Sequence, residues 1–557
     1  MNDSANTTSS SPGTSSTSTG TGTSPGNSST STGTSAREDS TSLPNILLIT
    51  LDQFRADCLS AAGHPLVRTP NLDRLADQGL RFANHYSNCA PCAPGRASLL
   101  TGLWQMNHRV TNNGAPLADN LPMLPRELRR AGYDPTLFGY TDTALDPATL
   151  EQSDPRRCSY EQPMDGFSVG VLLDDNIDPW IEWLAGQGFP VPEENRKIYD
   201  PAPIEIPEGR GATWPPATYS AEQTESAFLT ERALEWISSP DRGTDPWCAH
   251  LSYLRPHPPY LVPSPYNNMF DPADMPPALR HRTLQEEAEQ HPFLAAALTI
   301  VPSPAEELDQ RQLQATYFGM IAEVDHQVGV LLDGLEELGF SEDTIVILTS
   351  DHGEQLGDHW FLEKLGFFDQ SYRIPLIIRA PGRIEQPGRV VEAFTENVDI
   401  FPTLLDLIGI TPPDFCDGAS LAPFLDQASL PPTGPEHWRS AVHFEFDFRE
   451  PNSTIIESIF AIRQDQCAIS VIRDHDAKYV HFAGGLPPLF FDLRTDPEEL
   501  YNRAEDPALT STVLSYAQRL LSMKLEHTDP RLANTRATGF GTIHRPDPPR
   551  PDSQPPA

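Results

Sequence analysis

Positive charge is in short supply in this sequence. The 39 Lys and Arg stand against 77 Asp and Glu, which leaves a formal net charge of −38 over 557 residues. A chain this acidic repels phosphate backbones and anionic lipid headgroups, so we expect neither a nucleic-acid partner nor docking to a membrane surface. The sequence also lacks a run of about 18 uninterrupted apolar residues, so we expect no membrane-spanning segment.

Cysteine is also scarce. The seven cysteines are odd in number and scattered, which argues against the disulfide framework of a small secreted domain. The first 35 residues have neither the basic region nor the apolar region of a secretory leader. We therefore expect a cytoplasmic protein.

Composition divides the chain into four parts. Residues 1–42 are mostly Ser, Thr, Gly, Asn and Pro, which cannot bury enough apolar surface to offset their ordering entropy and so predict disorder. Residues 537–557 are rich in proline and predict an extended tail. Between them we expect a large α/β domain over residues 43–440 and a smaller subdomain over residues 441–536.

Two continuous apolar runs, at residues 45–51 and 343–350, are typical of strands buried on both faces of a parallel sheet. Apolar residues at helical spacing over residues 305–338 precede the second run, and a helix followed by such a strand is half of a βαβ unit. Asp399 is predicted to cap a helix that begins near Pro402. Segments of the smaller subdomain predict antiparallel strands closed by a helix: residues 441–446, 467–473, 478–482 and 510–524.

Acidic side chains follow both apolar runs. Asp52 comes directly after the first run, and Asp351 and His352 come after the second. Ligands gather at the carboxyl ends of strands in open α/β sheets, and carboxylates with an imidazole suit a divalent metal ion. The structural alternative is a capping or turn acid beside a histidine with satisfied hydrogen bonds.

The segment around Cys92 supports two interpretations. Cys89-Ala-Pro-Cys92 is formally a CxxC motif, but a second thiol pair and a thioredoxin-like βαβ context are missing. Read from the second cysteine, Cys92-Ala-Pro-Gly-Arg96 is followed by Leu100-Thr-Gly102. This pattern resembles the Cys-x-Pro-x-Arg signature of the sulfatase family, within the alkaline phosphatase superfamily. The resemblance implies an alkaline phosphatase-like α/β/α sandwich with a mostly parallel central sheet and a smaller C-terminal antiparallel-sheet subdomain.

The resemblance also implies a chemistry for Cys92. In the family this cysteine is oxidised to formylglycine by a formylglycine-generating enzyme, and one hydroxyl of the hydrated aldehyde attacks the ester. The second hydroxyl then expels the bound group by collapse to the aldehyde, so water need not hydrolyse the intermediate. The arginine four residues on, Arg96, is expected to hold the nucleophile's loop and the substrate oxyanion.

The metal ligands depart from the commonest family pattern. Most sulfatases have two adjacent acids at the first strand end and an Asp-Asn pair at the second, whereas this chain has Asp52-Gln53 and Asp351-His352. That mixture resembles the phosphonate monoester hydrolase and phosphodiesterase branch. With Cys92 as a further ligand, the softer donor set favours Mn²⁺, with Zn²⁺, Fe²⁺ and Ca²⁺ as alternatives.

Further positions match that branch, although each has a structural alternative as a turn, core or surface residue. His257 resembles its leaving-group acid, and Lys364 its lysine that contacts substrate oxygens. Two residues after Tyr140, where the branch commonly has threonine, this chain has Asp142, whose charge would repel an anion. Thr141 or Thr143 is expected to take the threonine's role; the alternative is a substrate that differs from the branch's. The remaining candidates for substrate binding are Asn113 and Tyr140.

Together these residues predict a metal-dependent hydrolase of anionic esters, namely phosphonate monoesters or phosphodiesters. A sulfuric ester hydrolase is the alternative. Two readings from other classes are a non-catalytic member that binds an anion or a partner, and a redox protein built on Cys89 and Cys92. The expected partners are a small anionic ester and the maturation enzyme, and the branch suggests a homotetramer.

Overall fold

The computed structural model describes residues 43–413, 415–528 and 535–544. The contact pattern separates residues 1–42 from residues 43–557. The predicted disorder of residues 1–42 and most of the predicted Pro-rich tail therefore lie outside the described residues. Within the described residues, no helix is both long and apolar enough to cross a lipid bilayer.

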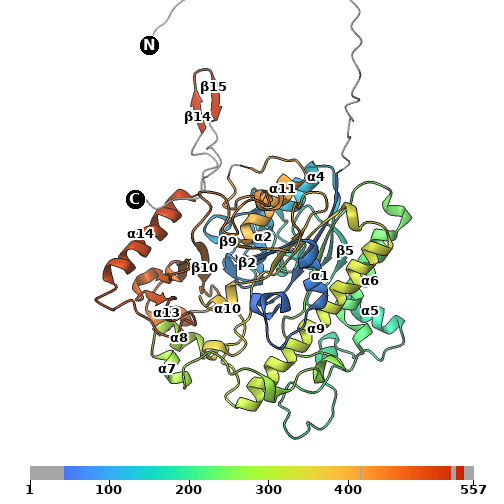
Figure 1. Cartoon of the computed structure of the whole chain (residues 1–557), viewed down its shortest axis with the longest axis horizontal. Coiled ribbons are helices and arrows are strands. Elements are labelled where there is room, and N and C mark those ends of the chain that lie inside the picture. Colours follow the sequence, from blue (N-terminus) through green and yellow to red (C-terminus); the bar gives the residue numbers. More distant parts are fainter. Residues whose placement is uncertain (1–42, 414, 529–534, 545–557) are drawn as a thin grey trace, which may run out of the picture. The chain divides into compact units, whose positions relative to one another are not determined.

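An eight-stranded sheet forms the centre of the larger part, with strand order β5-β4-β6-β1-β7-β8-β2-β9. Figure 1 labels its strands β2, β5 and β9. All of its pairings are parallel except those of β8, which runs antiparallel to β7 and β2. The strands are β1 (Asn45–Leu51), β2 (Leu80–Tyr86), β4 (Pro135–Gly139), β5 (Ser168–Leu172), β6 (Cys248–Tyr253), β7 (Thr344–Thr349), β8 (Leu376–Arg379) and β9 (Arg389–Glu396).

Both faces of this sheet are buried, which explains the continuous apolar runs. Successive side chains of a strand point to opposite faces. In β1, Leu47, Ile49 and Leu51 pack into one hydrophobic core, whereas Ile46 and Leu48 pack into another. The first core includes residues of α1 (Pro70–Gln78), α6 (Glu225–Ser238) and α9 (Glu307–Glu337); the second includes residues of α2 (Cys92–Thr101), α4 (Leu124–Arg130) and α11 (Ile400–Leu407). The predicted α/β/α sandwich is confirmed.

A second sheet has the strand order β13-β12-β11-β10-β3. Four of its strands come from the C-terminal region and pair antiparallel: β10 (Val442–Asp447), β11 (Ala468–Arg473), β12 (Ala477–Phe482) and β13 (Leu489–Asp492). The first three match the predicted antiparallel strands. The helix α14 (Thr510–Glu526) packs on them through Tyr516 and Leu520. The fifth strand, β3 (Cys89–Ala90), comes from far earlier in the chain and pairs in parallel with β10. The smaller sheet is therefore completed by the segment just before Cys92.

Two details differ from the sequence-based expectations. A hairpin of β14 (Thr535–Thr538) and β15 (Gly541–His544) occupies the start of the segment that was expected to be an extended tail. Asp399 does not cap α11, because a 3₁₀ turn at Asn397–Asp399 runs directly into that helix. The Asp399 carboxylate instead accepts the backbone N–H groups of Glu396 and Ala419.

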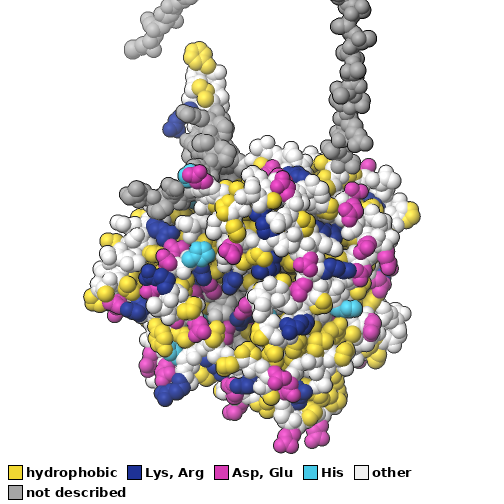
Figure 2. All heavy atoms as spheres, viewed as in Figure 1, with side chains coloured by type: hydrophobic (Ala, Val, Ile, Leu, Met, Phe, Trp, Pro, Cys, Tyr) yellow, Lys and Arg dark blue, Asp and Glu magenta, His cyan; other side chains and the backbone are white. Residues whose placement is uncertain are grey.

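Shorter helices complete the described part of the chain. They are α3 (Gln105–His108), α5 (Asp178–Gly186), α7 (Leu284–Ala288), α8 (Pro292–Ala297), α10 (Asp369–Tyr372), α12 (Ala422–Asp426) and α13 (Ile455–Phe460). On the face drawn in Figure 2, acidic and basic side chains are interspersed. The excess of negative charge is thus spread over this face rather than gathered in one patch.

Candidate active site

Four buried side chains converge at the carboxyl ends of two neighbouring strands. Asp52 follows β1 and Asp351 and His352 follow β7, and these two strands pair in parallel. Ligand atoms of these three residues and of Cys92 all lie within 4.8 Å of one another. His352 Nε2 is 3.1 Å from Cys92 Sγ and 3.7 Å from Asp52 Oδ1. Segments about 300 residues apart in sequence therefore form one cluster.

Close packing of α2 places Cys92 in this cluster. Cys92 is the first residue of α2 and is buried. A Cβ at Gly95, one turn further on, would lie 2.7 Å from the backbone oxygen of Asp351, so only glycine lets the helix approach this closely. The Ser87 hydroxyl donates to the same Asp351 oxygen. The glycine of the Cys-x-Pro-x-Arg motif thus sets the distance between the cysteine and the end of β7.

Arg96 joins the two carboxylates of the cluster. Its Nη2 donates to Asp52 Oδ2 and its Nε donates to Asp351 Oδ2, both at 2.9 Å. Its Nη1 donates to the backbone oxygen of Tyr140 at 2.8 Å and to Ser252 Oγ at 2.6 Å. The guanidinium is fully buried behind the acids and links α2, which carries it, to the ends of β1 and β7.

The charges in the cluster fit a bound cation. Burial raises the pKa of Asp52, but the positive charges around it, which include Arg96 and Lys364, outweigh burial and hold this pKa well below its usual range. Burial and the charge of Asp52 raise the pKa of Asp351 to about 7. Two carboxylates this close destabilise each other's charged forms, and a divalent cation between them would remove that repulsion.

His352 is prepared to act as a ligand. Its Nδ1 donates to the backbone oxygen of Gly353 at 3.0 Å, which leaves Nε2 as the acceptor that faces the cluster. Burial and the charge of Lys364 lower the pKa of His352 to about 3, so the imidazole is neutral at neutral pH. Two carboxylates, a neutral imidazole and position 92 are a suitable donor set for a divalent metal ion.

Gln53 lies beside the cluster but its amide is already occupied. Its backbone N–H donates to Asp351 Oδ1 at 3.2 Å, and its φ of 67° is in the left-handed region. Its side-chain oxygen accepts from Lys364 Nζ at 2.8 Å, and its side-chain nitrogen donates to Glu354. A metal bond to Gln53, as the sequence predicts, would therefore compete with the Lys364 contact.

Lys364 and His257 contact each other on one side of the cavity. Lys364 Nζ lies 3.1 Å from His257 Nε2, and His257 Nδ1 donates to the backbone oxygen of Pro258 at 2.7 Å. Burial and the charge of Lys364 lower the pKa of His257 to about 3. The imidazole is therefore neutral and accepts through Nε2, so the proton in this contact belongs to the lysine.

Two of the three predicted substrate-binding residues line the cavity. Tyr140 lines the cavity and donates its hydroxyl to Asp52 Oδ2 at 2.7 Å, and Asn113 lines it while accepting from the Ala93 N–H at 3.0 Å. Thr141 points the other way, where its hydroxyl donates to the Gln162 backbone oxygen and accepts from the Met164 N–H. Asp142, whose backbone φ is 49°, lines the cavity in place of Thr141.

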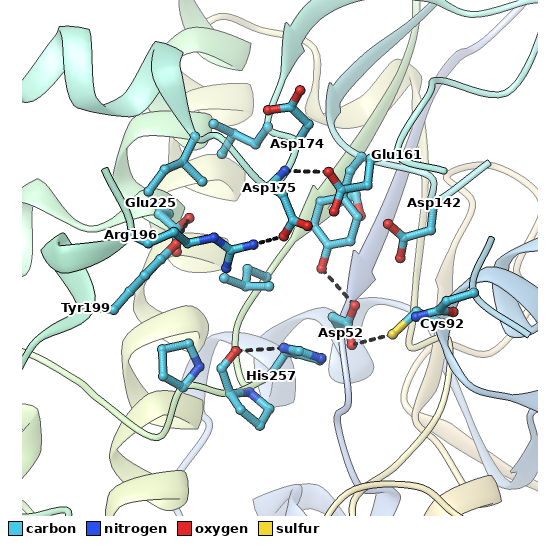
Figure 3. A pocket seen from close by; sticks show the side chains of 18 of the residues that line it. Asp52, Cys92, Asp142, Glu161, Asp174, Asp175, Arg196, Tyr199, Glu225 and His257 are labelled. Carbon is cyan, nitrogen blue, oxygen red and sulfur yellow. Dashed lines mark hydrogen bonds and ion pairs between the residues drawn. The ribbon is translucent and has the colours of Figure 1, made fainter. Parts of the chain in front are cut away.

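Several lining residues were not predicted from the sequence. The cavity of about 170 Å³ opens from Asp52 and Cys92 toward a group of charged side chains that Figure 3 shows opposite His257. These residues follow no motif and come from the segments around β5. Glu354 was also missed, although it stands three residues after Asp351, where its proximity to a strand-end acid was a usable signal. The outer residues are Tyr160, Glu161, Asp174, Asp175, Arg196 and Tyr199.

Comparison with known proteins gives consistent results. The sulfatase family model matches residues 44–410, and a model described as N-sulphoglucosamine sulphohydrolase, C-terminal, matches residues 357–526. The multifunctional alkaline phosphatase superfamily protein PehA of Trinickia caryophylli is 42% identical over 90% of this chain and 99% of its own length. The choline-sulfatase of Rhizobium meliloti is 30% identical over 84% of each chain.

The similar solved structures point to the same family as the sequence relatives. The phosphonate monoester hydrolase of Agrobacterium radiobacter has a TM-score of 0.85 at 44% identity, and that of Silicibacter pomeroyi has 0.84 at 36% identity. Each match covers 90% of this chain and 99% of the other. Fold and site together define a hydrolase of the alkaline phosphatase superfamily that acts on esters. Within that superfamily, the chain belongs to the sulfatase family.

Proposed function

We propose that the protein hydrolyses phosphonate monoesters or phosphodiesters with a nucleophile derived from Cys92. The observation that carries the proposal is the buried cluster of Asp52, Cys92, Asp351 and His352 at the end of an open cavity. Support for phosphorus esters comes from the mixed ligand set and from the similarity to two phosphonate monoester hydrolases. The family makes sulfate esters the second candidate, because an arylsulfatase of Clostridium perfringens is 27% identical over 87% of this chain.

Position 92 and the cluster supply the central chemistry in this proposal. A divalent ion, for which we propose Mn²⁺, would be held by Asp52, Asp351, His352 and position 92, with Gln53 beside it. When bound, it would neutralise substrate oxygens and favour the ionised nucleophile, here the hydrate of a formylglycine that a maturation enzyme makes from Cys92.

The chain's own groups orient the ester and move the proton. Arg96 fixes the two carboxylates, so it acts on the substrate through them. Lys364, whose ammonium donates to Gln53 beside the cluster, would donate to a substrate oxygen. His257 Nε2 accepts from Lys364, so a proton for the leaving oxygen would pass from this pair. The Asn113 amide lines the same cavity and can donate through its nitrogen.

Location and assembly are separate proposals. We propose a cytoplasmic protein from its few, scattered cysteines. We propose a homotetramer from the resemblance to the phosphonate monoester hydrolase branch.

Mass spectrometry of the peptide that contains Cys92 tests the nucleophile. We expect the mass of the aldehyde or its hydrate in active enzyme, and we expect Cys92→Ala to lower kcat about a thousandfold or more. Cys158→Ala, which removes an exposed thiol, is the matched control. A free thiol at position 92 in fully active enzyme would contradict the assignment.

Matched 4-nitrophenyl esters test the substrate class. With Mn²⁺ present, we expect a methylphosphonate monoester and a methyl phosphodiester to give higher kcat/KM than the sulfate monoester. Equal leaving groups ensure that the comparison reports on the transferred group. A higher value for the sulfate would favour the sulfatase alternative, and no turnover of any ester would indicate a non-catalytic member.

A further inference from the structure

The outer part of the cavity is lined by carboxylates. We call Asp142, Glu161, Asp174 and Asp175 the acidic wall; all four line the cavity, and Figure 3 shows them on the same side of it. Among the residues of the described chain that line this cavity, Arg196 supplies the one guanidinium, and it pairs with Asp175. Asp142, Glu161 and Asp174 therefore face the cavity without a lining cation of their own.

Of the four carboxylates in the acidic wall, that of Asp142 has the weakest favourable polar contacts. Its side chain is 9% exposed, and in the described part of the chain its carboxylate makes no hydrogen bond. The nearest cationic atom, Arg96 Nε, lies 3.6 Å away and already donates to Asp351 at 2.9 Å. The backbone φ of Asp142 is 49°, a strained value for a residue other than glycine. A strained residue thus holds a buried carboxylate, which makes no hydrogen bond to a described residue, toward the cavity.

The negative charges of the acidic wall destabilise one another. Burial and the charge of Asp52 raise the pKa of Asp142 to about 7 even though Arg96 lowers it. Burial, then the charges of Asp142 and Asp174, raise the pKa of Glu161 to about 7. The Glu161 carboxylate accepts the Asp175 N–H, and Asp174 accepts the Asn176 N–H, so both are fixed in position by the backbone. A cation placed among them would stabilise all three charges.

A metal ion does not fit this position. Over the residues that the structure describes, three or more ligand atoms close enough to hold one ion gather at the Asp52 cluster and at no other group. An organic cation is larger and can contact carboxylates that are further apart. The ring of Tyr160 also lines the cavity, and aromatic faces attract ammonium groups.

We propose that the acidic wall binds a positively charged organic group of the substrate, so that the preferred substrates are zwitterionic esters that carry an ammonium group. This inference rests on the proposed function and specifies its substrate class. The cavity would then be bipolar: cationic at Lys364 and the metal ion proposed for the cluster, where the ester anion binds, and anionic at the wall. A zwitterion brings an anion to the cationic end and a cation to the anionic end. A neutral substituent would leave the buried carboxylates of the wall without an opposite charge.

The ammonium group has two possible positions in such a substrate. It can belong to the alcohol that leaves or to the group that stays on phosphorus. Two pairs of matched substrates distinguish these sources. In each pair one aryl phosphonate monoester carries a trimethylammonio group and the other carries a tert-butyl group of the same shape. The first pair has this substituent on the leaving phenol, and the second has it on the group bound to phosphorus.

The readout is the ratio of kcat/KM for the cationic and the neutral member of a pair. Comparing this ratio between variants cancels both the intrinsic reactivity of the substrates and any general loss of activity. We expect Asp142→Asn and Glu161→Gln each to lower the ratio about 10-fold in one of the two pairs, because each removes one charge near the bound cation. Glu151→Gln, which removes an exposed carboxylate outside the cavity, should leave the ratio unchanged.

The outcomes separate the two proposals. If the wild type hydrolyses the esters but neither wall variant changes either ratio, the inference is overturned and the proposed function stands. If the wild type hydrolyses no member of either pair, the proposed function fails and the inference falls with it. Two variants of different residues ensure that a folding defect in one does not decide the result.

Discussion

At the residue scale, His352 is the most informative metal ligand to change. Its neutral Nε2 faces the cluster, and its Nδ1 is fixed by the Gly353 backbone oxygen. We expect His352→Ala to weaken metal binding at least about 10-fold, since one donor of the set is lost. Metal content after dialysis, measured by atomic emission, checks this.

His326→Ala is the matched control, because it removes an exposed imidazole from α9. Its metal content should equal that of the wild type. Stoichiometric metal in His352→Ala would remove His352 from the site, whatever the effect on activity.

Residue patterns at strand ends were the predictable part of the site. Asp52, Asp351 and His352 follow buried apolar runs, and parallel neighbouring strands bring such ends together. The sequence did not reveal that Asp142 rather than Thr141 lines the cavity, because this depends on which side of the chain faces the cavity beyond the end of β4. The acidic wall has no motif, and its position depends on how the segments around β5 fold over the sheet.

At the scale of elements, the contact between α1 and α9 offers a test of stability. The Asp325 carboxylate of α9 accepts the backbone N–H groups of Asn71 and Leu72 in the first turn of α1. A helix leaves its first N–H groups without partners inside the helix, so a distant acid here caps α1. We expect Asp325→Ala to lower the free energy of unfolding by about 1–3 kcal/mol, measured by urea denaturation.

The same two helices provide the control. Asp333 of α9 pairs with Arg74 of α1, but both side chains are substantially exposed, at 57% and 36%. Exposed ion pairs contribute about 0–1 kcal/mol, so Asp333→Ala should cost less than Asp325→Ala. Equal losses in the two variants would show that Asp325 does not cap α1.

Glu323, also on α9, links stability to pH. It is buried against α6, where it accepts hydrogen bonds from the hydroxyls of Thr224 and Ser226. Burial raises its pKa from 4.5 to about 7 despite these bonds. Between these values the folded protein retains a proton that the unfolded chain has released, so the free energy of unfolding falls as pH rises through this window.

Glu323→Gln should remove this dependence. We expect the variant to be more stable than the wild type above pH 7 by about 1–3 kcal/mol, with a smaller difference near pH 4.5. Glu336→Gln, an exposed change on the same helix, should follow the wild-type profile. Parallel curves for Glu323→Gln and the wild type, from denaturation at several pH values, would contradict the assignment.

At the scale of the whole molecule, the two sheets were predicted but the connection between them was not. Long apolar runs predict β1 and β7, and the C-terminal strands appear as separate short runs. The strand β3 has two residues, Cys89 and Ala90, which is too short for any periodic pattern. Its pairing with β10 depends on the tertiary packing of segments some 350 residues apart.

That short strand bears on the order of events as the chain is made. Cys92 lies two residues after β3, and its side chain is buried once α2 packs on the end of β7. The strand β10, which pairs with β3, begins only at Val442, late in synthesis from the N-terminus. If position 92 carries the proposed formylglycine, the enzyme that makes it would need the Cys92 thiol before α2 packs on the end of β7 and buries it. Folding and maturation would then compete for the same few residues.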